Sequence, residues 1–334
     1  MRPNSEDQGL FHETNLTLRV SVIIPTYNRA LYLAEAVRSA LMQTYPRKEV
    51  IVIDDGSTDN TGEVIRDFKD RVRYIRQPRL GKSQARNHGI RVAQGELIAF
   101  LDSDDIWLPS KLESQVRLFS SRKVGLAYTN CYQINEDGFI SGRFMSRPLN
   151  KSALEELFLS DFIPTSTLVV RRDCITSHHV NGFDEAVPWG EDYLLKVRLL
   201  AHFDVARVDK CLACWREHPS SGSRQQAHVS FQYRLVDRIC EEFPQLLPLR
   251  TSKIALLHWE EGMLNLSIGN AYKARQHFAQ SLKLDPRNSS VYALWLMALS
   301  GDLLGCRMYT WLKQIRKKQQ MEKSYRGLHW SSLS

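Results

Sequence analysis

Short runs rich in Val and Ile alternate with amphipathic stretches through the first hundred residues of the chain. The runs predict buried strands at 18–25, 49–53, 72–76 and 96–101. Apolar positions at helical spacing predict the intervening helices at 31–43, 61–68 and 82–94. Strands and helices in this rhythm require parallel crossovers. The predicted fold class is therefore α/β, with a Rossmann-like, mostly parallel sheet covered by helices on both faces.

The pattern loosens after residue 124 and becomes purely helical beyond residue 220. Strands are expected at 124–133 and 167–171, and helices at 154–159 and 191–201. Residues 269–286 resemble one tetratricopeptide repeat, a unit that needs a neighbour to complete its core. A helical cap on the α/β domain is the alternative. The predicted parts are a polar segment 1–16, an α/β domain 17–220, a helical extension 221–306 and a tail 307–334.

The composition is that of a globular protein, with 43% hydrophobic and 25% charged residues, which argues against collagen-like or small disulfide-rich chains. Uninterrupted apolar runs such as Leu97–Leu101 are far shorter than the roughly 18 residues of a membrane-spanning helix. Residues 1–16 lack the apolar stretch of a secretory signal. We therefore expect the chain to stay in the cytoplasm.

Much of the formal net charge of +8 lies near the C-terminus. Residues 307–334 contain seven Lys or Arg residues and one acidic residue, Glu322. Met308, Trp311 and Ile315 fall at helical spacing beside them, as on a basic amphipathic helix. Such a helix predicts peripheral contact with the anionic inner face of the plasma membrane, and a solvated tail is the alternative. No recognised nucleic-acid-binding module accompanies the tail, so nucleic acid is not an expected partner.

Two carboxylates, Asp102 and Asp104, flank Ser103 directly after a predicted buried strand. At this spacing they can hold one Mg²⁺ or Mn²⁺ ion, whose other ligands are commonly phosphate oxygens. The alternative is a helix start with acidic residues at its beginning and Asp105 as its N-cap.

Polar residues also follow the first and second predicted strands. Tyr27 can stack on a nucleobase, and Arg29 can reach a phosphate. Asp55 can accept a hydrogen bond from a base or a ribose hydroxyl, and Gly56 permits a tight turn there. The alternatives are a capped helix start and ordinary turn chemistry.

Three further elements carry charge. Lys82 and Arg86 lie four residues apart on one face of a helix whose N-terminus favours anions, with plain surface charge as the alternative. Glu191 and Asp192 open a helix, and one of them can accept a proton from a sugar hydroxyl; complementarity to the helix dipole is the alternative. His218 follows a strand and can ligate a metal, contact a phosphate or lie on the surface.

The order of these elements is more specific than any one of them. The motifs are Ser21-Val-Ile-Ile-Pro-Thr-Tyr-Asn-Arg29, Ile53-Asp-Asp-Gly-Ser-Thr-Asp-Asn-Thr61, Ala85-Arg-Asn-His-Gly89, Gly95-Glu-Leu-Ile-Ala-Phe-Leu-Asp-Ser-Asp-Asp105 and Gly190-Glu-Asp192. Together they resemble the family 2 glycosyltransferases with the GT-A fold, over residues 17–218. The resemblance implies an enzyme that moves one sugar from a nucleoside diphosphate donor, commonly UDP-linked, with inversion at the anomeric carbon.

The resemblance and the residue chemistry above assign roles position by position. The nucleotide would contact Pro25, Thr26, Tyr27, Arg29, Asp55, Lys82, Arg86, Asp102 and Ser103. A divalent cation, Mn²⁺ or Mg²⁺, would be held by Asp104, with Asp102 and His218 beside it. Asp192 would be the catalytic base, and its neighbour Glu191 is the second choice.

Polymer-forming members typically carry a Gln-x-x-Arg-Trp string and flanking membrane helices, and the sequence contains neither. We therefore expect one sugar to be added to a hydroxyl of a glycan or lipid-linked glycan in cell-surface polysaccharide synthesis. The metal and basic residues would neutralise the departing diphosphate while Asp192 takes the acceptor proton in a single displacement. The alternatives are a sugar-phosphate nucleotidyltransferase and a non-catalytic scaffold protein that binds nucleotide sugars.

Overall fold

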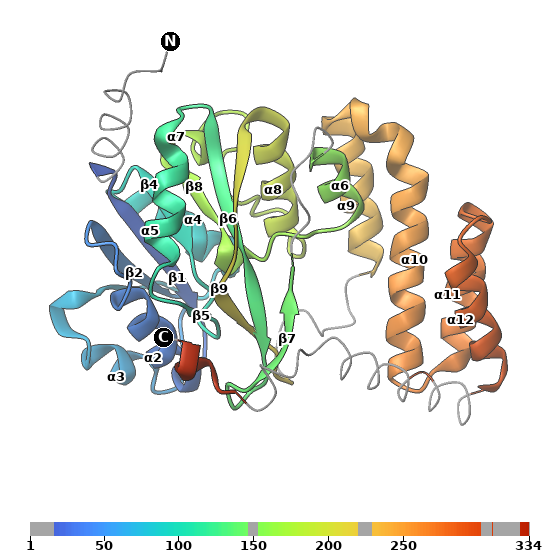
Figure 1. The fold of residues 1–334 in the computed structure, drawn as a ribbon, viewed down its shortest axis with the longest axis horizontal. Coiled ribbons are helices and arrows are strands. Elements are labelled where there is room, and N and C mark those ends of the chain that lie inside the picture. The colour runs from blue at the N-terminus through green and yellow to red at the C-terminus, as the bar shows by residue number, and fades with distance from the viewer. Residues whose placement is uncertain (1–16, 146–152, 220–228, 302–308, 310–327, 334) are drawn as a thin grey trace, which may run out of the picture. The chain divides into compact units, whose positions relative to one another are not determined.

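The computed structural model describes residues 17–145, 153–219, 229–301, 309 and 328–333 (Figure 1). The chain divides into two compact units. The first, called the α/β unit, comprises Met1–Leu154, Asp161–His218 and Gly327–Ser334, and the second, called the helical unit, comprises Glu155–Ser160 and Pro219–Arg326. The predicted polar segment 1–16 and most of the predicted tail 307–334 lie outside the described residues.

A nine-stranded sheet runs through the α/β unit (Figure 1). Its strands are β1 (Val20–Thr26), β2 (Lys48–Asp54), β3 (Arg73–Arg76), β4 (Leu97–Phe100), β5 (Ile106–Trp107), β6 (Val124–Ile134), β7 (Ile140–Phe144), β8 (Val169–Arg171) and β9 (Asp204–Arg216). They lie in the order β3-β2-β1-β4-β8-β6-β9-β5, and β7 pairs with β6. Pairing among β3, β2, β1 and β4 is parallel, as predicted, whereas β8 runs antiparallel to both β4 and β6. The α/β class with a parallel core is confirmed, and the remaining part of the sheet is mixed.

Helices fill most connections between these strands. They are α2 (Ala30–Leu41), α3 (Thr61–Arg66), α4 (Lys82–Val92), α5 (Lys111–Val116), α6 (Ala153–Leu159), α7 (Arg172–Ile175) and α8 (Glu191–His202). The strands and helices predicted before residue 102 are confirmed, with ends that differ by at most two residues. The sequence did not predict β5, β7, α5 or α7, nor the extent of β9.

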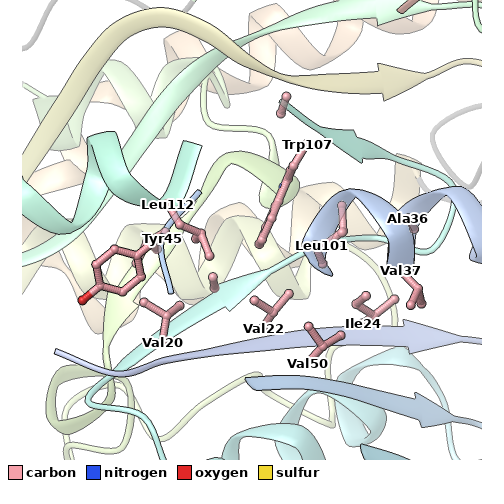
Figure 2. Close-up of a cluster of buried hydrophobic side chains, with 14 of the residues drawn as sticks. Val20, Val22, Ile24, Ala36, Val37, Tyr45, Val50, Leu101, Trp107 and Leu112 are labelled. Carbon is pink, nitrogen blue, oxygen red and sulfur yellow. The ribbon is translucent and has the colours of Figure 1, made fainter. Parts of the chain in front are cut away.

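Strand β1 is buried on both faces, which explains its uninterrupted apolar sequence. Val22 and Ile24 belong to the same buried cluster as Val37 of α2 (Figure 2). Ile23 faces the other way, because a Cβ atom added at Gly89 of α4 would lie 2.5 Å from its Cγ2 atom. Helices therefore cover both faces of this strand, and each fully buried aliphatic side chain contributes about 1.5–3 kcal/mol to folding.

The carboxyl ends of β1, β2 and β4 meet at one edge of the sheet because these strands are parallel neighbours. Hydrogen bonds join the turn after β1 to the turn after β2. Asn28, whose φ is +51°, accepts from the Thr58 N–H through Oδ1 at 2.8 Å. Its own N–H donates to Ser57 Oγ at 3.0 Å. Hydrogen bonds therefore hold the two polar turns predicted after β1 and β2 side by side.

The helical unit contains α9 (Val229–Glu242), α10 (Arg250–Ser267), α11 (Ala271–Leu284) and α12 (Ser289–Leu299). Helices α10 and α11 approach closely, since a Cβ atom at Gly262 would lie 2.4 Å from the Phe278 ring. Phe278 shares a small apolar core with Val291 of α12. Residues 285–288 separate α11 from α12. Among the described helices, none combines the length and apolarity needed to cross a bilayer.

Lys111 is completely buried at the start of α5. Its Nζ atom lies over the Trp107 ring, 4.0 Å from the ring centre, and no described residue accepts a hydrogen bond from it. Burial lowers the pKa of this amine well below its ordinary value. The folded protein therefore binds a proton at Lys111 less readily than the unfolded chain does.

Substitution Lys111→Met is expected to increase the free energy of unfolding at neutral pH by on the order of 2 kcal/mol. The wild-type penalty should shrink as the pH rises toward the ordinary lysine pKa, because the unfolded chain then also loses its proton. Stability should thus rise with pH more steeply in the wild type than in the variant. Urea unfolding across this range measures both effects, with the exposed Lys123→Met as control. A less stable Lys111→Met protein at neutral pH would contradict the interpretation.

Candidate active site

The loop after β4 places Asp102 and Asp104 beside different partners. The Asp102 Oδ1 atom accepts a hydrogen bond from the guanidinium of Arg86 at 2.7 Å. The Asp104 Oδ2 atom lies 2.9 Å from Nε2 of His218, which follows β9. The side chain of Arg29, after β1, approaches the same Asp104 oxygen at 3.8 Å. Residues predicted from three separate motifs therefore meet at this edge of the sheet.

Asp105, the third carboxylate of this loop, is buried and has a structural role. It accepts from the Ser166 hydroxyl at 2.5 Å and from the Arg216 backbone N–H at 2.9 Å. Burial, together with the charges of Asp104 and Asp102, raises the pKa of this carboxyl. Strand β5 follows it directly, and α5 begins only at Lys111, so the alternative of Asp105 as a helix N-cap is wrong.

Arg216, at the end of β9, organises this loop and was missed by sequence reasoning. Its side chain is 2% exposed and donates to the Asp104 carbonyl at 3.0 Å, the Glu136 carbonyl at 2.8 Å and the Glu35 carboxylate at 2.5 Å. Its guanidinium also lies over the Tyr32 ring, at 4.8 Å. An arginine inside an otherwise apolar strand end was the available signal, because buried arginines are almost always paired.

Asp104 and His218 are the two predicted metal ligands that the structure brings close enough to hold one divalent cation. Their donor atoms are 2.9 Å apart, and the Asp104 side chain is 20% exposed. Mg²⁺ and Mn²⁺ sites commonly use one or two protein ligands and leave the rest to phosphate oxygens and water. Asp102 turns toward Arg86, and within the described residues no three His, Cys, Asp or Glu side chains converge as a metal site. The structure thus brings together a pair from the predicted set.

Arg86 and Lys82 of α4 converge on Glu191 at the start of α8. The Glu191 Oε1 atom lies 2.9 Å from both the Arg86 guanidinium and Lys82 Nζ. The Glu191 and Arg86 side chains are almost inaccessible, at 1% and 6% exposure. Burial opposes the charge on Arg86, but Asp102 and Glu191 outweigh it, so the pKa of Arg86 is raised. Arg86 therefore joins α8 to the loop after β4, residues 101–105, which we call the acidic loop. Glu191 forms ion pairs with both Arg86 and Lys82.

Asp192, the predicted base, differs from Glu191 in exposure and in partners. Its side chain is 31% exposed, and its Oδ2 atom accepts from the Thr165 hydroxyl at 2.8 Å and from Lys196 Nζ at 3.3 Å. Burial would raise the pKa of Asp192, but Lys196, Arg86 and Lys82 outweigh it and lower that pKa. The carboxylate is therefore held ionised beside an accessible surface.

The short 3-10 helix η4 (Thr165–Thr167) links the predicted base to the acidic loop. Thr165 donates to Asp192, and the next residue, Ser166, donates to Asp105. The Ser166 hydroxyl oxygen also accepts from the Asp102 N–H at 3.0 Å. Two consecutive side chains thus hold the predicted base and the predicted metal loop in one network, and neither was identified from the sequence.

Lys196 is a buried cation that positions Asp192. Its ammonium donates to Asp161 Oδ2 at 2.5 Å and to the Ile163 carbonyl at 2.8 Å, in addition to Asp192. These three acceptors match the three protons of an ammonium group. The sequence signal was its position four residues after Asp192 on one helix, where opposite charges meet.

Substitution Lys196→Met is expected to move the acidic limb of the pH profile of kcat/KM upward by about 1–3 pH units, because the pKa of Asp192 rises when the facing cation is removed. Asp161→Asn should not move the limb upward, since it removes a carboxylate that competes with Asp192 for Lys196. Initial rates of both variants between acidic and neutral pH test these expectations. An unchanged limb in Lys196→Met, despite measurable activity, would contradict this role.

The predicted nucleoside residues lie on and after β1. Pro25 and Thr26 end the strand, and Thr26 Oγ1 is buried without a hydrogen-bond partner among the described residues. The Arg79 guanidinium lies over the Tyr27 ring, 4.1 Å from the ring centre. Ser103 is buried within the acidic loop. An aromatic ring beside a cation and an unpaired hydroxyl can receive a base and a sugar hydroxyl.

Asp55 is engaged by the loop between β3 and α4. Its Oδ1 atom accepts from Gln77 Nε2 and from the Leu80 N–H, and its Oδ2 atom accepts from the Gly81 N–H, all at 2.8 Å. Gly56 has a φ of +81°, and a Cβ atom there would lie 2.9 Å from the Arg79 backbone nitrogen. The tight turn predicted at Gly56 is confirmed, and Asp55 fixes the loop that carries Arg79.

Comparison with known proteins gives the family. Residues 21–176 match the model described as Glycosyl transferase family 2. The Escherichia coli protein UDP-Glc:alpha-D-GlcNAc-diphosphoundecaprenol beta-1,3-glucosyltransferase WfaP is 36% identical over 185 residues, which cover 54% of this chain and 70% of WfaP. The chain belongs to glycosyl transferase family 2. The resemblance inferred from the motifs is therefore confirmed.

Other relatives of this family 2 chain differ in length. The putative teichuronic acid biosynthesis glycosyltransferase TuaG of Bacillus subtilis is 35% identical over 237 residues, or 68% of this chain and 91% of TuaG. Uncharacterized glycosyltransferases of Rickettsia felis and Rickettsia conorii are both 32% identical, but the chain spans only 34% and 32% of their length.

Solved structures agree with the fold. Residues 1–349 of S. aureus TarS, in complex with UDP-GlcNAc, match 92% of this family 2 chain and 93% of that chain, with a TM-score of 0.55 and 18% identity. The mannosyltransferase PcManGT from Pyrobaculum calidifontis, in complex with GDP-Man and Mn²⁺, matches 85% and 81%, with a TM-score of 0.52 and 19% identity. The GT-A-like fold followed by C-terminal helices is thereby confirmed.

Proposed function

We propose that the protein transfers one sugar from a UDP-sugar to a hydroxyl of a lipid-linked glycan, with inversion, in the synthesis of a cell-surface polysaccharide. The names of the relatives support these classes. WfaP is named for UDP-Glc and a GlcNAc-diphosphoundecaprenol acceptor, TuaG for teichuronic acid, and a TarS structure contains UDP-GlcNAc. We assign the transfer to the predicted domain 17–220 and treat 221–306 as a helical extension.

The observation that carries the proposal is the network through η4, in which Thr165 contacts Asp192 while Ser166 contacts the acidic loop. Asp192 is ionised and accessible, so it can accept the proton of an acceptor hydroxyl as that oxygen attacks. A single displacement of this kind needs no covalent nucleophile and inverts the anomeric carbon, as in inverting glycosidases.

The basic side chains and the acidic loop would stabilise the departing diphosphate. Negative charge accumulates on the departing diphosphate, and preorganised cations stabilise it. Lys82 and Arg86 supply two such cations at the start of α4. A divalent cation held by Asp104 and His218 would, when bound, add Lewis-acid stabilisation of the diphosphate oxygens. The nucleoside would bind to Thr26, Tyr27 and the other residues predicted to contact the nucleotide after β1 and β2.

The test is a transfer assay with the full chain. UDP-Glc, UDP-GlcNAc, UDP-Gal and GDP-Man are each incubated with a synthetic GlcNAc-diphospholipid, in Mn²⁺ or after chelation. We expect transfer from one UDP-sugar, release of UDP, and a β linkage by NMR when the donor is α-linked. Pyrophosphate release from UTP and a sugar phosphate would support a nucleotidyltransferase instead. Donor binding without transfer to any glycan acceptor would support a scaffold protein.

A further inference from the structure

Asp161 shares the buried cation Lys196 with the predicted base, Asp192. Lys196 Nζ lies 2.5 Å from Asp161 Oδ2 and 3.3 Å from Asp192 Oδ2. The Lys196 side chain is 1% exposed, whereas those of Asp161 and Asp192 are 34% and 31% exposed. The two carboxylates therefore cover the ammonium as close neighbours, and each keeps part of its side chain open to solvent.

One short segment, residues 161–165, faces the shared ammonium and the base. The ammonium donates to the Ile163 carbonyl at 2.8 Å, and the Thr165 hydroxyl donates to the base at 2.8 Å. Asp161 Oδ1 accepts from the Ile163 N–H at 3.2 Å. Contacts within the protein itself therefore fix the position of the Asp161 carboxylate beside the base.

Charge balance does not require Asp161. Lys196 already has an anionic partner in Asp192, four residues earlier on the same helix. A second carboxylate competes with Asp192 for the ammonium, which weakens the contact that positions the base. Lys196 and the Ile163 N–H use two of the roughly four acceptor sites of the Asp161 carboxylate. The remaining sites, on a partly exposed side chain, are suited to a hydroxyl donor from a substrate.

We propose that Asp161 binds the acceptor sugar through the hydroxyl next to the one that attacks. Neighbouring hydroxyls of a sugar ring can each donate to one of two adjacent carboxylates, and hydrogen bonds to a charged acceptor are strong. One hydroxyl gives its proton to Asp192, while its neighbour on Asp161 fixes the orientation of the sugar. The favoured acceptor is accordingly a sugar with two free vicinal hydroxyls. This inference rests on the proposed function, because it takes Asp192 as the base.

The experiment uses acceptors that lack one hydroxyl. The full chain is assayed with the GlcNAc-diphospholipid and with its 3-deoxy and 4-deoxy analogues, in the presence of the UDP-sugar that supports transfer. NMR of the product identifies the hydroxyl that attacks, and the analogue without its neighbour is then the test acceptor. We expect kcat/KM of the wild type to fall about ten- to hundredfold with the test acceptor, because a hydrogen bond to a charged group is lost.

Asp161→Ala should lower kcat/KM for the complete acceptor by a similar factor. Its further loss with the test acceptor should be less than about threefold, because the contact is already absent. Asp161→Asn keeps the shape of the side chain and should lie between the wild type and Asp161→Ala. Asp173→Ala, at an exposed aspartate of α7, is the matched control and should keep the full wild-type loss. Thermal stability and the dissociation constant of the UDP-sugar should be unchanged in all three variants.

Three results in an active enzyme would overturn the inference. The first is an unchanged kcat/KM in Asp161→Ala, and the second is a set of independent losses, in which the variant and the missing hydroxyl multiply. The third is transfer to the 6-hydroxyl, which has no vicinal hydroxyl. Failure of the proposed function would look different, since the wild type would then transfer sugar to none of the acceptors, and both proposals would be wrong.

Discussion

Substitution Asp192→Asn is expected to lower kcat by about a thousandfold, while the dissociation constant of the UDP-sugar changes by less than about threefold. The amide keeps the size of the side chain and can still accept from Thr165 and Lys196, so the local structure should persist. It cannot take a proton from the acceptor hydroxyl, and that loss corresponds to about 4 kcal/mol in the barrier. Single-turnover rates and donor titration by calorimetry measure the two quantities separately.

Glu191→Gln is the matched control, because it makes the same chemical change one residue earlier. Glu191 is 1% exposed and faces Lys82 and Arg86. Its substitution leaves two cations with a weaker partner, so thermal stability and donor affinity should change more than the chemical step. If Glu191→Gln stops turnover with donor binding intact and Asp192→Asn stays active, the roles of the two carboxylates are reversed.

Strands β1, β2 and β4 of the parallel half could be predicted because they are largely buried on both faces. Val22, Ile23 and Ile24 are all inaccessible, so β1 reads as one apolar run. Strand β9 could not be predicted in the same way. Only Leu212, Ala213 and Cys214 near its end are buried apolar residues, while its middle includes Asp209 and Lys210. Partial exposure removes the apolar signal on which strand prediction depends.

Some site residues could be predicted from their position in the chain, and others could not. Asp102 and Asp104 follow the end of β4, and Asp192 lies at the start of α8, so their positions in the chain place them near the edge of the sheet. Arg216 acts through contacts that no local pattern records: its N–H reaches Asp105 across 111 positions of the sequence.

The same holds for η4, whose Ser166 reaches Asp105 across 61 positions. Residues 164–167 read as an ordinary polar segment, and their importance depends on where the fold brings them. The sequence therefore indicated the groups that we propose contact a ligand more readily than the groups that hold them in place.

Asp104→Asn is expected to lower kcat/KM by about a hundredfold and to raise the Mn²⁺ concentration needed for half-maximal activity. Among the three carboxylates of its loop, Asp104 is the best placed to bind a cation. Asp102 is engaged by Arg86, and Asp105 is buried with a raised pKa. The Asp104 side chain is 20% exposed beside the His218 imidazole, and its other ionic neighbour, Arg29, is 3.8 Å away.

An amide oxygen is a weaker ligand for Mn²⁺ than a carboxylate, so Asp104→Asn lowers the affinity for the cation while preserving the shape of the loop. His218→Gln should shift the Mn²⁺ dependence in the same direction, because it alters the second donor of the pair. The exposed Asp70→Asn, outside the site, should leave both quantities unchanged. Titration of activity with Mn²⁺ after chelation gives the comparison. An identical Mn²⁺ curve for Asp104→Asn and the wild type would move the cation away from this loop, and the remaining candidates would then be the second oxygen of Asp102 and the phosphates of the donor.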